Sequence, residues 1–242
     1  MGQKVHPYSF RLGYIKDWKS RWYTNKKDYP RFLKEDVEIR RHIKKAITGG
    51  AISSIEIERA SNRIRIFIHT ARPGVIIGRR GSEIERLKED LQNITQNEIF
   101  IEIKEIKSAA CDAQLIAENI AFQLEKRIPF RRAMKKAVQN AMNQGLGGIK
   151  LMVSGRLDGS EIARKEKYKR GKIPLQTIRA NVDYGFIEAH TTYGLIGIKV
   201  WTYKGDIIKG LNDKKAEKSD GNDAQKGKVS QVPERKAKRD KF

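Results

Sequence analysis

Cysteine is almost absent from this chain of 242 residues, since Cys111 is the only one. No intramolecular disulfide can form, and the alanines around Cys111 indicate a small packed residue rather than a reactive thiol. No apolar run approaches the roughly 20 residues of a membrane-spanning helix, and residues 1–7 lack the apolar stretch of a signal peptide. We therefore expect a protein that stays in the cytoplasm, with no membrane partner.

Catalytic and metal-binding motifs are also missing. The chain contains no G-x-x-x-x-G-K-[ST] phosphate loop, no H-E-x-x-H and no paired C-x-x-C. Its four histidines are scattered, and His190, in a His-Thr-Thr-Tyr-Gly segment, is interpreted as structural rather than as a catalytic base. The sequence therefore predicts no enzyme, metal site, cofactor or small-molecule substrate.

Acidic residues are few relative to basic ones. The chain has 51 lysine and arginine residues against 29 aspartate and glutamate residues, a formal net charge of +22. Such an excess repels itself in a compact protein unless a polyanion neutralises it, and nucleic acid is the commonest one. A basic protein without a specific partner is the alternative, but the clustering of the cations disfavours it.

An irregular N-terminal arm is expected at residues 1–17, followed by a first domain at 18–106. Its hydrophobic periods predict helix, strand, strand, short helix, helix and strand. These elements are expected at 31–47, 55–58, 64–68, 75–77, 82–94 and 99–103. Residues 60–62 are expected to form the hairpin turn, and Ser82 with Glu85 a capping box.

A second domain is expected at residues 107–207, with two helices on an antiparallel sheet, so the fold class is α+β. Its helices are expected at 112–127 and 131–144, and its strands at 149–153, 175–184 and 195–203. The very basic segment 161–169 is expected to be a short helix. Residues 208–242 hold eleven basic and six acidic residues but few apolar ones. We expect them to be a disordered tail, because they cannot bury enough apolar surface.

The strongest local signal is a loop between the last two helices of the first domain. Its glycines allow a nucleic-acid backbone to approach closely, and the amides of the following helix favour phosphate. KH domains use a G-x-x-G loop to hold about four nucleotides, and the flanking element order matches the type II KH fold. We therefore predict an RNA-binding loop made of Gly78, Arg79, Arg80 and Gly81. A glycine-punctuated turn is the alternative.

Aromatic residues offer a weaker signal nearby. Trp18, Trp22 and Tyr23 lie among lysines and arginines. They could stack on bases or anchor the arm to the domain, and the sequence leaves both interpretations open.

A second cationic feature lies on the helix that begins near residue 131. Four basic residues share one arc of the helical wheel, and Met134, Val138 and Ala141 lie on the opposite side. The four are Arg131, Arg132, Lys135 and Lys136. A solvated helix face is the alternative, but few acidic residues could pair with this stripe, and a basic run at 164–172 follows.

Several segments together resemble a known family. They are MGQKVHP (1–7), RLG (11–13), IHTARPG (68–74), GRRG (78–81), FRRAMKKAVQNAM (130–142), SGRL (154–157) with Gly159, EIAR (161–164) and HTTYG (190–194). In this order they resemble the bacterial small-subunit ribosomal protein S3 family. The resemblance covers residues 1 to about 208, is looser between Trp18 and Ile52, and omits the tail.

The resemblance implies a type II KH domain and a C-terminal α+β domain on the head of the small ribosomal subunit. The expected partners are 16S ribosomal RNA, messenger RNA and ribosomal proteins S10 and S14. The basic residues of the helix at 131–144 would line the channel where messenger RNA enters and help to open its hairpins. Ribosomal RNA contacts are expected at Lys4, Arg11, Arg72, Arg156, Arg164, Lys165, Lys167, Lys169 and Arg170.

Two other functions would be compatible with a basic KH protein. A transcription or RNA-regulatory factor would bind a specific free RNA and would not sediment with small subunits. An RNA-modifying enzyme or nuclease would need a convergent acid/base pair, and the sequence singles out none.

Overall fold

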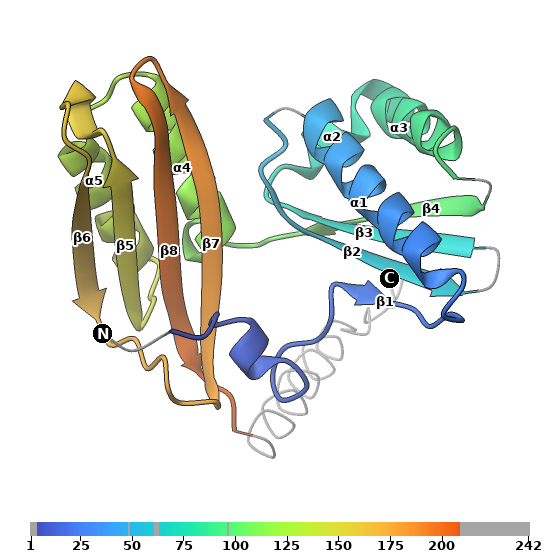
Figure 1. Ribbon diagram of the computed structural model, residues 1–242, viewed down its shortest axis with the longest axis horizontal. Coiled ribbons are helices and arrows are strands. Elements are labelled where there is room, and N and C mark those ends of the chain that lie inside the picture. The colour runs from blue at the N-terminus through green and yellow to red at the C-terminus, as the bar shows by residue number, and fades with distance from the viewer. Residues whose placement is uncertain (1–3, 48, 61–62, 96, 209–242) are drawn as a thin grey trace, which may run out of the picture. The chain divides into compact units, whose positions relative to one another are not determined.

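Each of the two folded parts of the chain consists of helices packed on a β-sheet (Figure 1). The computed structural model describes residues 4–47, 49–60, 63–95 and 97–208, without the side chain of Arg80. The expected hairpin turn at 60–62 and the expected tail therefore lie almost entirely outside the described residues. No helix within the described ranges is long and apolar enough to span a membrane.

The N-terminal part has the element order that the sequence predicts. It contains α1 (Tyr29–Ala46), β2 (Ile52–Ala60), β3 (Arg63–Thr70), α2 (Pro73–Ile77), α3 (Ser82–Gln92) and β4 (Glu98–Glu105). Strands β2 and β3 pair antiparallel, and β3 and β4 pair parallel. A two-residue strand that the sequence did not reveal, β1 (Ser20–Arg21), pairs parallel with β2. The type II KH prediction is confirmed.

Isoleucine alternation produces the core of this domain. In β3, Ile64, Ile66 and Ile68 are fully buried, because successive side chains of a strand point to opposite faces. They pack against Ile39 and Ile43 of α1. Burial of each such side chain contributes roughly 1.5–3 kcal/mol.

A buried ion pair fixes the chain entering the KH domain. The Asp36 carboxylate, fully buried in α1, accepts hydrogen bonds from Nε and Nη2 of Arg59 at 2.9 and 2.7 Å. Its other oxygen accepts from Ser20 Oγ at 3.0 Å and from Trp22 Nε1 at 2.9 Å. Trp22 is therefore an anchor, whereas Trp18 is 62% exposed.

The C-terminal part is the expected α+β unit. Its elements are α4 (Ala113–Glu125), α5 (Phe130–Asn143), β5 (Gly148–Gly155), β6 (Arg164–Gly171), β7 (Ala180–Thr191) and β8 (Gly194–Asp206). The sheet has the strand order β6-β5-β8-β7, and β5 pairs antiparallel with both β6 and β8. Both helices cover the same face of this sheet (Figure 1).

Short 3-10 turns connect several of these elements. They are η1 (Ser9–Arg11), η2 (Arg79–Gly81), η3 (Ala109–Cys111) and η4 (Leu157–Gly159). Asp112 caps α4, since its carboxylate accepts hydrogen bonds from the amides of Gln114 and Leu115. Cys111 is partly buried beside Ser108, with 3.3 Å between Sγ and Oγ, as a packed residue.

Two secondary-structure predictions are wrong. The segment 161–169, expected to be a helix, lies mostly in β6, which pairs with β5 over its whole length. The pairing allows Tyr168 to pack against the core while its neighbours stay exposed. The strand expected from 175 begins only at Ala180, because the carbonyl groups of Leu175 and Thr177 accept hydrogen bonds from a side chain instead.

Candidate nucleic-acid interface

The G-x-x-G loop joins α2 to α3 and requires its first glycine. Gly78 adopts a left-handed φ of +70°, and a Cβ at this position would collide with the side chain of Glu83. Gly81 also has a positive φ, +86°, but the space around it is open. A larger residue at Gly78 would therefore be strained and also sterically blocked.

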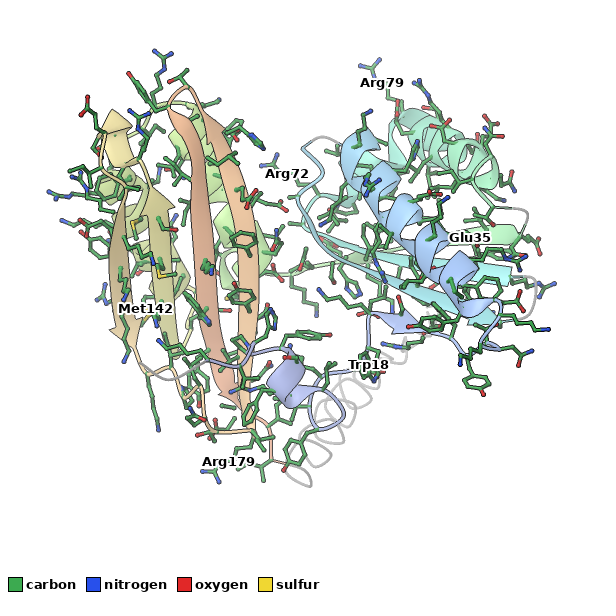
Figure 2. The ribbon with its side chains drawn as sticks, in the orientation of Figure 1. Trp18, Glu35, Arg72, Arg79, Met142 and Arg179 are labelled. Carbon is green, nitrogen blue, oxygen red and sulfur yellow. The ribbon has the colours of Figure 1, made fainter. Side chains whose placement is uncertain are left out.

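Cations and carboxylates meet at this loop. Arg79 is exposed, and its side chain points away from the ribbon (Figure 2). The first turn of α3 contains Glu83 and Glu85. Their negative charges interact favourably with the positive end of the helix dipole, but they repel a phosphate bound at the same place. Ser82 is the first helical residue and makes no capping hydrogen bond, so the predicted capping box is wrong; Gly81 is the N-cap.

A cavity of about 670 Å³ lies beside the loop, between α1, α2 and α3. Its polar lining mixes His42, Lys45 and Arg86 with Glu83 and Asp90. This balance of charges does not favour a polyanion, so the predicted RNA contact remains with the loop itself.

The basic stripe on α5 has the geometry that the sequence predicts. Arg131, Arg132, Lys135 and Lys136 are all exposed, while the opposite side of the helix is buried in the core. The buried side consists of Phe130, Ala133, Met134, Val138 and Ala141. Among the described residues, none of the four cations forms an ion pair. The 14-residue helix holds these charges on a rigid support.

Two further exposed cations precede α5 in the chain, and the sequence reasoning did not single them out. Lys126 and Arg127 are exposed in the turn between α4 and α5, where Arg127 adopts a positive φ of 58°. Pro129 is the N-cap residue of α5 and provides no side-chain hydrogen bond to the helix. The signal was present in the sequence, because a Lys-Arg pair stands just before the Ile-Pro step that separates the two helices.

The basic run downstream is an edge strand rather than a helix. In β6, Lys165, Lys167 and Lys169 pair with Ser154, Met152 and Lys150 of β5 and share one face of the sheet. Arg164 and Arg170 have the opposite parity and lie on the face that the helices cover. All five basic residues of this strand are exposed.

Arg11 is not available to RNA, which corrects its assignment as a ribosomal RNA contact. Its side chain is fully buried. The guanidinium donates hydrogen bonds at 2.6 to 3.1 Å to one backbone carbonyl of the N-terminal arm and to four in the segment that leads into β7. The acceptors are Pro7, Pro174, Leu175, Thr177 and Ala180. The other single cations assigned to ribosomal RNA, Lys4, Arg72 and Arg156, are exposed.

Within the described part of the chain, no group of three or more His, Cys, Asp or Glu side chains could hold a metal ion. His190 lies in β7, where its backbone amide donates to Glu125 Oε1 at 3.1 Å.

The fold and its exposed cations define the class: an RNA-binding KH protein with a second α+β domain. Residues 38–110 match the family described as KH domain, and residues 120–202 match "Ribosomal protein S3, C-terminal domain". The chain belongs to the small ribosomal subunit protein uS3 family.

Three curated relatives bear the name small ribosomal subunit protein uS3. The Caldicellulosiruptor saccharolyticus protein is 61% identical over 209 residues, which cover 86% of this chain and 94% of the relative. The Acidobacterium capsulatum protein is 59% identical, with 86% and 93% covered. The Lawsonia intracellularis protein is 56% identical over 218 residues, with 90% and 100% covered.

Proposed function

We propose that this protein is a structural constituent of the small-subunit head that binds 16S ribosomal RNA and also holds messenger RNA where it enters the ribosome. The observation that carries the messenger role is the α5 stripe: four exposed cations, without ion-pair partners among the described residues, on a helix whose other side is core. The relatives' name supports the place on the small subunit.

The stripe suits a single RNA strand for a geometric reason. The four residues fall at positions i, i+1, i+4 and i+5, so they lie on one face within about 8 Å along the axis. Neighbouring phosphates of a single strand can meet such a row, and each neutralised phosphate releases counterions. Fixed cations of this kind disfavour the re-pairing of an opened hairpin and need no nucleotide hydrolysis in this chain.

The remaining assignments rest on family membership. Residues 18–106 are proposed as the KH domain and 107–207 as the C-terminal domain, with the loop at 78–81 and the exposed cations of β6 as ribosomal RNA contacts. Ribosomal proteins S10 and S14 are proposed as neighbours, and the cytoplasm as the location.

The test replaces Arg131, Arg132 and Lys135 with alanine in the full chain. Ribosomes that carry this variant should translate through a stable hairpin more slowly, at unchanged speed on unstructured message. The matched control replaces Lys26, Lys27 and Lys88, three exposed lysines outside the proposed interface, with alanine. Transit times are measured on paired messages with and without the hairpin.

Sedimentation of the same ribosomes at high salt gives the second readout. The variant should remain on small subunits, because its other proposed RNA contacts are intact. Equal hairpin transit for variant and control would overturn the messenger role. A wild-type chain that binds free RNA and stays off small subunits would instead indicate an RNA-regulatory factor.

A further inference from the structure

One face of the C-terminal sheet carries no helix. The helices α4 and α5 cover the other face (Figure 1). Because side chains alternate along strands, this second face is defined by the residues that pair across it; the N-terminal arm touches one end of it, where the His6 ring lies 4.6 Å from that of Tyr184. The register places Lys150 opposite both Lys169 and Trp201, and Met152 opposite both Lys167 and Lys199.

Five lysines therefore gather on this surface, which we name the lysine face. It consists of Lys150, Lys165, Lys167, Lys169 and Lys199. None of them forms an ion pair with another described residue. Like charges directly opposite in a sheet are destabilising, as they are for Lys150 and Lys169. Burial, reinforced by the charges of Lys4, Lys167 and Lys169, lowers the pKa of Lys150.

Aromatic rings lie among these lysines. The Lys150 Nζ is 4.8 Å from the ring centroid of Trp201, and the Lys199 Nζ is 5.7 Å from that of Phe186. Tyr184 packs beside Trp201 at 5.5 Å between ring centroids. Phe186 is 43% exposed, although it lies in a β-strand.

Acidic side chains are nearly missing from the same face. Tyr184 contacts Trp201, and Phe186 contacts Lys199, so the even-numbered residues of β7 point toward the lysine face. By that alternation Glu188 is the one acidic residue among the described strand residues of the face. The positive charge is therefore left for a ligand to neutralise.

We infer that the lysine face binds an unpaired segment of RNA, with phosphates on the lysines and a base stacked on Phe186. Aromatic rings bordered by cations are the usual platform for single strands, because every base has a ring face to stack. An acidic protein would use the lysines but would gain little from an exposed phenylalanine. The inference rests on the proposed function in taking RNA as the ligand, and it shares the lysines of β6 with the ribosomal RNA contacts proposed above.

The test uses the full chain with the three α5 substitutions in place, so that the α5 stripe does not contribute. The probes are a uridine oligonucleotide about 12 nucleotides long and an RNA duplex of equal length, with a polyglutamate peptide as competitor. The variant Phe186→Leu removes the ring but keeps an apolar side chain. The matched control is Phe122→Leu, since Phe122 on α4 is 56% exposed and also has a lysine over its ring.

Phe186→Leu should weaken binding of the oligonucleotide at least about fivefold, as expected for the loss of one stacked base, with duplex affinity unchanged. Phe122→Leu should leave both affinities unchanged. A second variant, Lys167→Gln with Lys169→Gln on the exposed edge strand, should weaken both RNAs. Circular dichroism and urea midpoints confirm that each variant is folded.

Unchanged oligonucleotide affinity in folded Phe186→Leu would overturn the inference. Displacement of the oligonucleotide by polyglutamate at the same concentration of negative charges would also overturn the inference, and would assign the face to an acidic protein. Neither result bears on hairpin transit, which depends on the α5 cations that this background lacks. The two proposals can therefore fail separately.

Discussion

The Nε of Arg11 donates a hydrogen bond of 2.6 Å to the backbone carbonyl of Ala180, joining residues far apart in the chain. The same guanidinium donates to four other carbonyls, one of them in the N-terminal arm. None of these acceptors carries a charge, so the buried cation is held by carbonyl dipoles and by the Phe10 ring, whose centroid lies 5.6 Å from Arg11 Cζ. Burial lowers the pKa of Arg11, although an arginine remains protonated at neutral pH.

Arg11→Ala should lower the free energy of unfolding by at least about 3 kcal/mol. Several buried carbonyls would lose their donors, at about 1–3 kcal/mol for each one left unsatisfied. Arg11→Lys should restore only part of the lost stability. The five carbonyls surround three nitrogen atoms of a planar guanidinium, and a single ammonium group cannot reach all of them. Urea denaturation measures both variants.

The control for Arg11 is Lys4→Ala, in the same arm but exposed. Its effect should stay within about 0.5 kcal/mol. A loss below about 1 kcal/mol in Arg11→Ala would mean that water replaces the guanidinium, and that the arm is not fixed through this residue.

Arg11 also shows where sequence reasoning ends. A basic residue in a segment shared with a ribosomal family is a natural candidate for an RNA contact. Four of its five acceptors are carbonyl groups 163 to 169 positions away, and no local pattern encodes them. The late start of β7 has the same cause, because carbonyls at 174–177 bond to the arginine rather than to a neighbouring strand.

The KH elements could be predicted because isoleucines alternate in β3 and β4 and leave a clear period. Strand β6 could not, because lysines and arginines occupy both of its faces and hide the alternation; only Tyr168 marks the inner side. The α5 stripe was predicted, since a helical wheel separates its cations from Met134. The lysine face needed the register of β5 with its two neighbours, which is a long-range fact.

Glu118 on α4 should make stability depend on pH. Burial raises the pKa of this carboxyl above its usual 4.5. The folded state therefore holds the proton more tightly than the unfolded chain. The favourable contribution is fully present below about pH 4.5 and is lost as pH rises through the folded-state pKa. At neutral pH the ionised, partly buried Glu118 therefore lowers the free energy of unfolding.

Glu118→Gln removes that cost. The variant should match wild type near pH 4 and be more stable at pH 7, as measured by urea unfolding at both values. Asn119→Gln, an exposed neutral change on the same helix, serves as the control and should show no pH-dependent difference. A difference for Glu118→Gln that is equal at both pH values would show that packing, not ionisation, governs this site.

Salt dependence measures how many cations RNA neutralises. The logarithm of the association constant for a single strand should fall linearly with the logarithm of salt concentration, by roughly 0.7 per neutralised phosphate. Replacing Arg131, Arg132 and Lys135 with alanine should reduce the magnitude of that slope by about 2, if each residue meets one phosphate. Fluorescence anisotropy of a labelled oligonucleotide over a salt series gives both slopes.

The control variant at Lys26, Lys27 and Lys88 should keep the wild-type slope. A slope near zero in the wild type would mean that charge is not the main attraction, whereas equal slopes in wild type and the α5 variant would move the contact to other cations.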